Sequence, residues 1–201
     1  MKRKIIGQIL RHGKTYDNLL HVMSGYRNPA LLPEGINQLK QLRNHLNLMD
    51  TDLNYTTDLD RAIDTFKIYF PNTPIDKILP EFREFNFGRF EGQNIDQVAD
   101  LTYHYFLNNI DDNLQWVETY NQCLNRYQQG FNKIIDDLRQ TNSSSFTLMA
   151  HNGTMRMFKN MLFGFDKETF RQFKTENGKG IIITFDLDDH SISNFTLEII
   201  Q

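Results

Sequence analysis

Short apolar runs alternate along the chain with stretches in which apolar residues recur at helical spacing. Residues 4–10 form one such run and are followed at once by charged residues, which predicts a buried strand leading into a functional loop. From Pro33, which suits the first turn of a helix, apolar side chains recur every three or four positions to about residue 50. Further strands are predicted at 53–55, 75–79 and 146–150, and further helices at 154–163 and at 60–70, the latter with Thr57 and Asp58 at its N-cap.

The remaining segments continue this alternating order. Residues 95–138 are polar and aromatic without a turn-rich linker, which predicts helices that cover one side of the molecule. The apolar runs 180–186 and 193–200 are joined by polar residues and predict a closing hairpin. The alternation favours a single α/β domain over residues 1–201, with a mostly parallel sheet and helices on both faces.

Charged and imidazole side chains follow the predicted strands at the points where they end. Arg11 and His12 follow the first strand, and Arg61 follows the second. Glu84 comes after the third strand and His151 after the fourth. Ligands of such sheets bind beyond the carboxyl ends of the strands. We therefore expect these five side chains to converge on one site.

The residue types at this site suit phosphoryl transfer without a metal. An arginine fork binds two phosphate oxygens and keeps its charge, so Arg11 and Arg61 can neutralise a phosphoryl group. A neutral imidazole at His12 can attack phosphorus and form a phosphohistidine, which divides one difficult displacement into two easier ones. A bound phosphate dianion would favour the protonated form of Glu84, which can then protonate the leaving alkoxide and later deprotonate water.

Composition narrows the possible partners and the location. The formal net charge is −3, with 22 Lys and Arg scattered among 25 Asp and Glu, which disfavours a nucleic-acid partner. No apolar run approaches the roughly 20 residues of a membrane-spanning helix, and no exposed apolar stripe indicates an oligomer. The single cysteine, Cys123, cannot form an internal disulfide, and without an export signal this favours the cytoplasm. The other histidines lack ligand spacing, so we expect neither a metal nor a cofactor and interpret them as ordinary: His21, His45, His104 and His190.

Five segments resemble, in the same order, the motifs of the histidine phosphatase (phosphoglycerate mutase-like) superfamily. Any one short motif arises by chance, but the ordered set between about residues 5 and 160 is specific. The first is similar to R-H-G-(E/Q)-T-x-x-N and the last to S-H-G-G-x-x-R. The residues that carry the resemblance are Arg11-His12-Gly13-Lys14-Thr15 with Asn18, Leu32-Pro33-Glu34-Gly35 with Gln38, Thr57-Asp58-Leu59-Asp60-Arg61-Ala62 with Thr65, Arg83-Glu84-Phe85-Asn86-Phe87-Gly88 with Phe90-Glu91-Gly92, and His151-Asn152-Gly153-Thr154-Met155-Arg156.

The resemblance implies a three-layer α/β/α sandwich and a phosphatase that acts on a small phosphorylated metabolite. It implies that His12 is the nucleophile, that Glu84 is the proton donor, and that Arg11, Arg61 and His151 bind phosphate. Substrate contacts are expected at Asn18, Ser24, Gly25 and Asn152.

The chain departs from the family pattern near the expected substrate. Asn152 replaces the glycine that usually follows the second histidine, where a side chain would either crowd the phosphate or add a donor to it. Residues 26–29 lack the aspartate often found in the family loop. Residues 95–138 correspond to the region that commonly forms a lid, and we expect some of the aromatic residues between Tyr103 and Tyr127 to line the pocket.

Two alternative functions remain open from the sequence. A phosphoglycerate mutase would transfer the phosphoryl group to a second substrate hydroxyl, but residues 87–92 lack the R-H-Y-G-x-L-x-G pattern of the mutases. A non-catalytic phospholigand-binding protein would need only the arginines and would not need His12 or Glu84. Glu81 and Glu91 are the rival acids, and the spacing to the following Phe-Gly pair favours Glu84.

Overall fold

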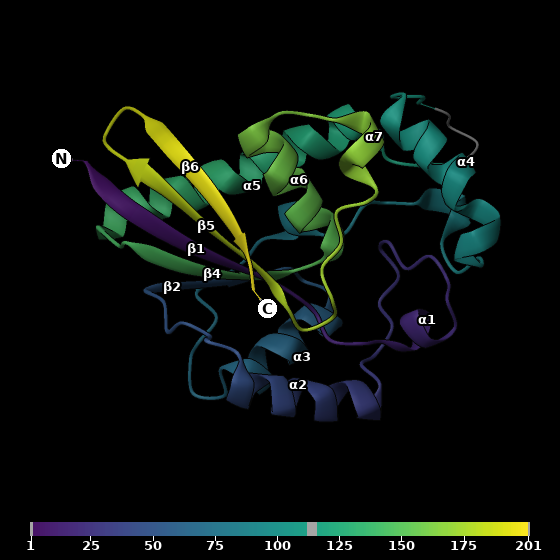
Figure 1. Cartoon of the computed structure of the whole chain (residues 1–201), viewed down its shortest axis with the longest axis horizontal. Helices are drawn as coiled ribbons and strands as arrows, with labels where there is room; N and C mark the ends of the chain where they lie inside the picture. The colour runs from purple at the N-terminus through teal and green to yellow at the C-terminus, as the bar shows by residue number, and fades with distance from the viewer. Residues whose placement is uncertain (1, 112–115, 201) are drawn as a thin grey trace.

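The computed structural model describes residues 2–111 and 116–200. A central six-stranded sheet lies between two groups of helices (Figure 1). Four neighbouring strands are parallel, and the last two pair antiparallel at one edge. The strands follow one another across the sheet in the order β3 (Lys77–Ile78), β2 (Leu53–Thr56), β4 (Ser145–Ala150), β1 (Arg3–Arg11), β5 (Gly180–Leu187) and β6 (Ile192–Ile199).

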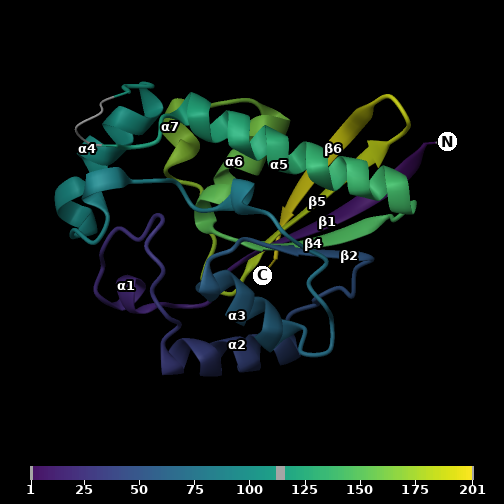
Figure 2. The same ribbon diagram turned by 180° about the vertical axis from the view of Figure 1, so that it is seen from behind.

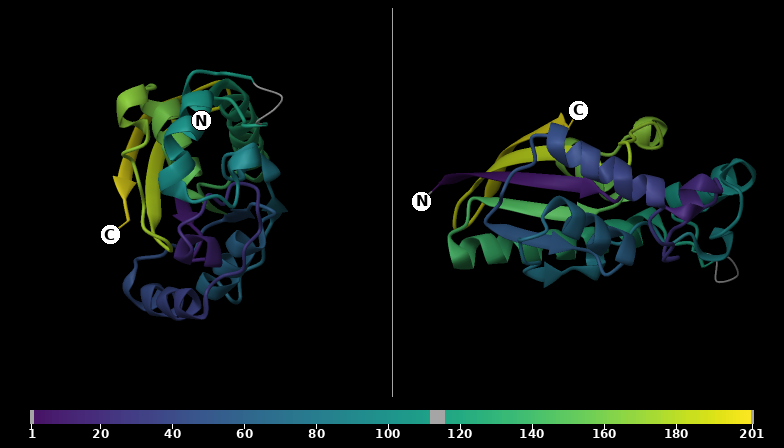
Figure 3. Two further views of the ribbon diagram at one scale, coloured as in Figure 1. Left: turned by 90° about the vertical axis from the view of Figure 1, so that its right-hand side faces the viewer. Right: turned by 90° about the horizontal axis from the view of Figure 1, so that it is seen from below.

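Helices cover both faces of this sheet. They are α1 (Tyr16–Leu19), α2 (Pro33–His45), α3 (Asp60–Tyr69), α4 (Ile95–Leu107), α5 (Tyr120–Thr141), α6 (Asn152–Phe163) and α7 (Lys167–Phe170), with the short 3-10 turns η1 (Pro80–Phe82) and η2 (Gly88–Phe90). Helices α2 and α3 lie on one face, and α5 and α6 lie on the other (Figures 1 and 2). The view from below in Figure 3 looks onto the face of the sheet that α2 and α3 cover. The predicted three-layer α/β/α sandwich with a mostly parallel sheet is therefore confirmed.

Alternation along the central strands explains why the sheet needs both helical layers. Successive side chains of a strand point to opposite faces. In β1, Ile9 belongs to the larger apolar cluster, which includes α5 and α6, whereas Leu10 belongs to the smaller cluster with α2 and α3. Leu148 and Met149 of β4 divide in the same way. Both faces of the sheet thus carry apolar side chains, which pack against the helices on either side.

Three predicted boundaries need correction. Helix α2 ends at His45, not near residue 50, because the backbone becomes extended at Leu46. Strand β3 contains only two residues of the predicted 75–79, although Asp76 and Leu79 also donate backbone hydrogen bonds to β2. Helix α6 begins at Asn152, ahead of residue 154.

The predicted N-cap of α3 is wrong. Leu59 occupies the N-cap position and makes no side-chain cap bond. The Thr57 hydroxyl lies 2.9 Å from Nε2 of His151, and the Asp58 carboxylate pairs with Arg83. Both polar side chains are engaged by partners distant in sequence, which a local capping pattern cannot anticipate.

Within the predicted helical stretch 95–138, residues 95–107 (α4) and 120–138 (in α5) are helical, residues 108–111 and 116–119 between them are not, and residues 112–115 lie outside the described residues. Helix α5 runs along one face of the sheet, and α4 lies apart from it beyond the strand ends (Figure 2). In 2–111 and 116–200, no helix combines the length and apolar character needed to cross a membrane.

Candidate active site

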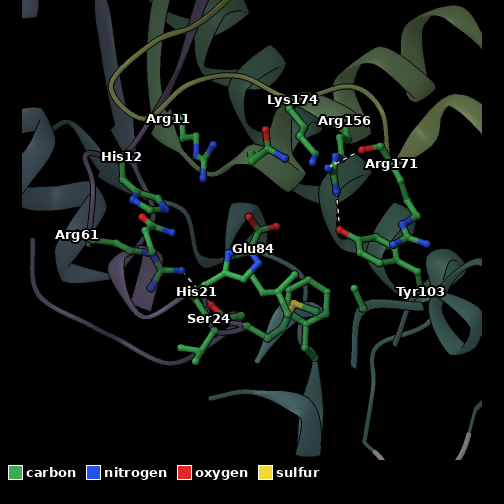
Figure 4. Close-up of a pocket in the computed structure, with 18 of the residues that line it drawn as sticks. Arg11, His12, His21, Ser24, Arg61, Glu84, Tyr103, Arg156, Arg171 and Lys174 are labelled. Atoms are coloured by element: carbon green, nitrogen blue, oxygen red, sulfur yellow. Dashed lines mark hydrogen bonds between the residues drawn. The ribbon is translucent and has the colours of Figure 1, made fainter. Parts of the chain in front are cut away.

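A pocket of about 570 Å³ opens at the edge where β1, β2 and β4 end (Figure 4). Side chains of the first, third, fourth and fifth motif segments come together there, whereas the second segment, residues 32–38, contributes none to the lining. His151 lies beside the pocket, with its ring centroid 5.2 Å from that of His12. The predicted site residues that line the pocket are Arg11, His12, Asn18, Ser24, Gly25, Arg61, Glu84 and Asn152.

His12 is held in one tautomer and orientation. Its side chain is 5% exposed, and Nδ1 lies 2.7 Å from the carbonyl oxygen of Gly13. A carbonyl only accepts, so Nδ1 carries the proton and the lone pair remains on Nε2. Burial lowers the pKa of His12 well below its usual 6.5, and the charges of Arg61 and Arg11 lower it further. The imidazole is therefore neutral at neutral pH.

His151 is also neutral and is fully buried. Burial is the largest cause that lowers the pKa of His151 well below 6.5, and electrostatic interactions with Arg61 and His12 lower it further. The Thr57 hydroxyl lies within hydrogen-bonding distance of Nε2, whereas Nδ1 has no partner among the described residues. The Nε atoms of Arg11 and Arg61 are likewise buried without a described partner. Three unsatisfied nitrogen atoms close to one pocket favour an oxygen-rich ligand, because buried polar groups rarely remain unpaired.

The two arginines are held by backbone carbonyls. Arg61, only 1% exposed, donates from Nη1 to Arg27 at 2.6 Å and from Nη2 to Gly25 at 2.9 Å. Arg11 donates from Nη1 to the carbonyl of Thr175 at 2.5 Å. Burial lowers the pKa of Arg61 to about 10, so it keeps its charge at neutral pH. Each guanidinium can thus be fixed by the protein and still present N–H groups to a ligand.

Replacing Arg61 with lysine should lower kcat/KM for a phosphomonoester by at least about 100-fold, because hydrogen bonds to charged groups contribute roughly 1.5–3 kcal/mol each and two are lost. The single ammonium group of lysine cannot donate to the carbonyls of Gly25 and Arg27 and also bind two phosphate oxygens, as the guanidinium can. The inhibition constant of inorganic phosphate should rise in parallel. Arg43→Lys, on the exposed surface of α2, is the matched control. Equal phosphate affinity in Arg61→Lys and wild type would contradict the role given to the fork.

Glu84 faces the pocket with its carboxylate fixed by two backbone donors. Phe85 donates to Oε1 at 3.0 Å, and Gly153 donates to Oε2 at 3.2 Å. Gly153 lies in the first turn of α6, whose N-cap is His151, so the same stretch of chain holds the second imidazole and the Glu84 carboxylate.

The two rival acids have structural partners. Glu91 accepts from the backbone N–H groups of Tyr26, Arg27 and Phe87, and so holds the loop before α2 against η2. Glu81 pairs with Lys133 of α5. Neither lines the pocket, so the geometry favours Glu84 as the acid.

Gly153→Ala should reduce kcat strongly, because a Cβ there would lie 1.9 Å from Oε1 of Glu84 and displace the carboxylate. General acid–base groups contribute about 10²–10⁴-fold, which sets the expected loss. Adding Glu84→Gln to Gly153→Ala should cause little further loss, because both changes remove one function. Gly164→Ala, at a positive-φ position with nothing within 4 Å of the new Cβ, controls for general strain. Fully multiplicative losses in the double variant would show that Gly153 does not act through Glu84.

Asn152 turns its side-chain oxygen away from a phosphate-binding role. Oδ1 accepts from the backbone N–H of Thr175 at 2.9 Å, which ties the start of α6 to the segment before β5. No described residue accepts from its Nδ2, which leaves a donor at the pocket wall. Asn18 also has a local task, because its Oδ1 accepts from the backbone N–H of Thr15 at the start of α1.

The pocket contains residues that sequence reasoning did not select. His21, interpreted as ordinary, lies in the wall with Nε2 3.0 Å from Asp96. Tyr103 is the member of the aromatic group in 103–127 that lines the pocket. Arg156 and Phe87 carried a sequence signal as members of the segments around His151 and Glu84, and Tyr103 belongs to the aromatic group that was expected to supply part of the wall. The additional lining residues are His21, Val22, Met23, Phe87, Ile95, Ala99, Tyr103, Arg156, Arg171, Gln172 and Lys174.

The buried histidines predict an acid-sensitive fold. Because the folded-state pKa values of His12 and His151 lie below 6.5, the unfolded chain binds more protons than the folded chain below that pH. Their contribution to the free energy of unfolding is complete above 6.5 and should be lost on acidification at a slope that approaches about 2.7 kcal/mol per pH unit, or two protons at about 1.36 each. Urea unfolding across this range measures it.

Single variants divide this slope between the two histidines. His12→Gln and His151→Gln should each remove about half of it, whereas His45→Gln, exposed at the end of α2, should leave it unchanged. Identical pH dependence in wild type and both variants would mean that neither imidazole is held neutral by the fold.

This fold and site define an α/β enzyme that acts on phosphate esters, with guanidinium groups and neutral imidazoles at the strand ends. The family model of the histidine phosphatase superfamily (branch 1) matches residues 8–197, and the chain belongs to this superfamily of phosphoric monoester hydrolases.

Individual relatives are distant but extend over most of the chain. The adenosylcobalamin/alpha-ribazole phosphatase of Escherichia coli (strain K12) is 22% identical over 172 residues, which is 85% of either chain. The phosphoglycerate mutase structure from Bacillus anthracis str. Sterne has a TM-score of 0.77 at 18% identity and covers 99% of this chain and 93% of its own. The phosphoserine phosphatase from Entamoeba histolytica, in complex with 3-phosphoglyceric acid, has a TM-score of 0.72 at 21% identity, over 98% and 96% of the two chains. These structural similarities establish the fold.

Proposed function

We propose that the protein hydrolyses a small phosphomonoester in two steps through a phosphohistidine at His12, without a metal ion. The observation that carries the proposal is the state of His12: neutral, with Nδ1–H fixed on Gly13 and Nε2 free, between Arg11 and Arg61. A structural histidine would not need a fixed tautomer between two guanidinium groups that each retain an unpaired buried nitrogen.

In the first step the phosphoryl oxygens lie between the guanidinium groups of Arg11 and Arg61, and Nδ1 of His151 donates to one of them. Nε2 of His12 attacks phosphorus while the bond to the leaving oxygen breaks. Protonated Glu84 gives its proton to that oxygen, so an alcohol leaves and Glu84 becomes a carboxylate. The positive charge on the phosphorylated imidazole is balanced by the phosphoryl oxygens.

In the second step Glu84 removes a proton from water, and the oxygen of that water attacks phosphorus. The bond between phosphorus and Nε2 breaks, which returns His12 to its neutral form and releases inorganic phosphate. The same carboxyl group therefore acts as acid and then as base, and each cycle restores its proton.

The helical region 95–138 is proposed as the cover of this site, because Ile95, Ala99 and Tyr103 of α4 line the pocket. We propose a small metabolite as substrate, since the net charge of −3 disfavours nucleic acid. A cytoplasmic location is proposed on the ground of the single cysteine, Cys123, which is buried and free.

Hydrolysis of p-nitrophenyl phosphate in excess EDTA tests the function and its metal independence together. Turnover should persist at the rate measured without chelator, because guanidinium groups neutralise the phosphate. Loss of activity in EDTA that returns on addition of a divalent cation would contradict the proposal.

A phosphoglycerate mutase is the second candidate, favoured by the likeness in fold to the Bacillus anthracis enzyme. The two functions differ in the acceptor of the phosphoryl group. With 3-phosphoglycerate a phosphatase releases inorganic phosphate, whereas a mutase yields 2-phosphoglycerate without net release. Isomerisation faster than phosphate release would replace the first proposal by the second.

A further inference from the structure

The pocket holds more positive charge than one phosphoryl group needs. Five cationic side chains and one carboxylate, Glu84, line it in a protein whose net charge is −3. Arg11 and Arg61 lie beside His12, where two guanidinium groups suffice for a phosphoryl dianion. Three further cations, Arg156, Arg171 and Lys174, lie toward the other end of the pocket (Figure 4). A concentration of one charge in a cleft attracts and orients ligands of the opposite charge.

Arg156 is committed to the protein and fixes the neighbouring segment. It is 6% exposed and donates from Nε to the carbonyl of Phe173 at 2.8 Å and from Nη2 to that of Arg171 at 2.9 Å. Its Nη1 donates to the Tyr103 hydroxyl at 2.5 Å. Arg156 thus sets the path of residues 171–173 along the pocket, and its own hydrogen bonds are largely used.

Lys174 is the cation left for a ligand. None of the described residues forms a hydrogen bond or ion pair with its ammonium group, which projects into the pocket in Figure 4. The next residue, Thr175, is fixed at both backbone groups, because its carbonyl accepts from Arg11 and its N–H donates to Asn152. The backbone that carries Lys174 is therefore held against the phosphate-binding side of the site, while its side chain remains unpaired.

Arg171 contributes a second, partly neutralised charge. Its Nη1 lies 2.7 Å from Asp100, in an exposed ion pair, and its guanidinium carbon lies 4.7 Å from the centre of the Tyr103 ring. Such exposed pairs contribute little stability, so a ligand anion can compete with Asp100 for the guanidinium.

We propose that the substrate carries a second anionic group, a carboxylate or another phosphate, and that Lys174 with Arg171 binds it at the end of the pocket away from His12. The inference rests on the proposed function, and it narrows the substrate class to phosphomonoesters with at least one further negative charge. Lys174 and Arg171 determine specificity, whereas Arg156 is a positioning residue.

Binding to the His12→Ala variant tests the second subsite without turnover. 3-Phosphoglycerate and glycerol 3-phosphate differ only in a carboxylate that replaces a hydroxymethyl group. Ribulose 1,5-bisphosphate and ribulose 5-phosphate differ by one phosphate. Calorimetric titration at low ionic strength should give about tenfold tighter binding for the more anionic member of at least one pair, and the pair that responds identifies the group. Equal affinities within both pairs would overturn the inference.

Single variants show which residues cause the tighter binding of the more anionic ligand in a pair. The measured quantity is the dissociation constant of the less anionic ligand divided by that of the more anionic one. Lys174→Ala in the His12→Ala background should reduce this ratio to near one. Lys179→Ala is the control and should leave the ratio unchanged, because Lys179 lies in the same loop but pairs with Glu176 outside this pocket. Asp100→Asn should increase the ratio, because Arg171 loses its competing carboxylate. A Lys174→Ala change that weakens both members of a pair equally would mean that Lys174 holds the transferred phosphoryl group, and the assignment would fail.

Turnover by the enzyme with His12 intact separates this inference from the function on which it rests. Absence of hydrolysis of all four esters and of p-nitrophenyl phosphate would overturn the proposed phosphatase while leaving the binding ratios interpretable. Hydrolysis of the esters together with equal dissociation constants would overturn only the second subsite.

Discussion

Replacement of His12 by alanine is expected to abolish phosphomonoester hydrolysis, with kcat reduced by at least about 10⁴-fold, as for removal of the nucleophile in other covalent mechanisms. The arginines, His151 and Glu84 would remain, so the variant should still bind inorganic phosphate. Steady-state assays with p-nitrophenyl phosphate measure the loss of activity. Calorimetric titration of the variant with inorganic phosphate measures the retained binding.

Two controls separate chemistry from folding in this experiment. His45→Ala removes an exposed histidine outside the pocket and should retain wild-type turnover. Added imidazole should partly restore hydrolysis to His12→Ala, because a free nucleophile can occupy the space of the missing ring, and a merely structural histidine would not be rescued in this way. Turnover within tenfold of wild type in His12→Ala would contradict the nucleophilic role.

Glu84→Gln is expected to lower kcat for alkyl phosphates at neutral pH by about 10²–10⁴-fold. Glutamine keeps the size of the side chain and an oxygen that can accept from Phe85 or Gly153, but it cannot donate a proton to an alkoxide or accept one from water. The fold should therefore persist while both steps slow.

The leaving group distinguishes the two tasks of Glu84. p-Nitrophenolate departs without protonation, so Glu84→Gln should release it in a burst of about one equivalent and then turn over slowly, since water activation still needs the base. Alkyl phosphates should show no burst. Equal slowing of burst and steady state with p-nitrophenyl phosphate would indicate that Glu84 positions the substrate instead of transferring protons.

The fold and the reacting end of the pocket were predictable because their signals are local. Each of these two strands is a short apolar run with a site residue at its end, since Arg11 ends β1, His12 follows it, and His151 follows β4. Parallel pairing then brings these ends together by topology alone. The same logic placed Arg61 and Glu84 at this edge, and the spacing that favoured Glu84 selected the one of the three rival carboxylates that lines the described pocket.

The other end of the pocket was not predictable, because hydrogen bonds between residues distant in sequence determine the path of its backbone. Arg171 and Lys174 lie in a segment without periodicity, whose path is set by Arg156 and by the bonds of Thr175 to Arg11 and Asn152. The N-cap error at α3 has the same origin, since His151 and Arg83 engage the side chains expected to cap the helix. A sequence pattern shows which neighbouring residues a side chain could bond to, but it does not show that a residue distant in sequence is the actual partner.

The covalent intermediate provides the most direct test of the mechanism. Rapid quench of the enzyme during turnover into alkaline denaturant, which preserves the P–N bond, followed by proteolysis and mass spectrometry at alkaline pH, should detect one phosphoryl group on the peptide that contains His12, bonded to Nε2. The modified fraction should rise in Glu84→Gln and vanish in His12→Ala. Continued hydrolysis with no phosphorylated His12 at any time, or a phosphoryl group on another side chain, would contradict the account.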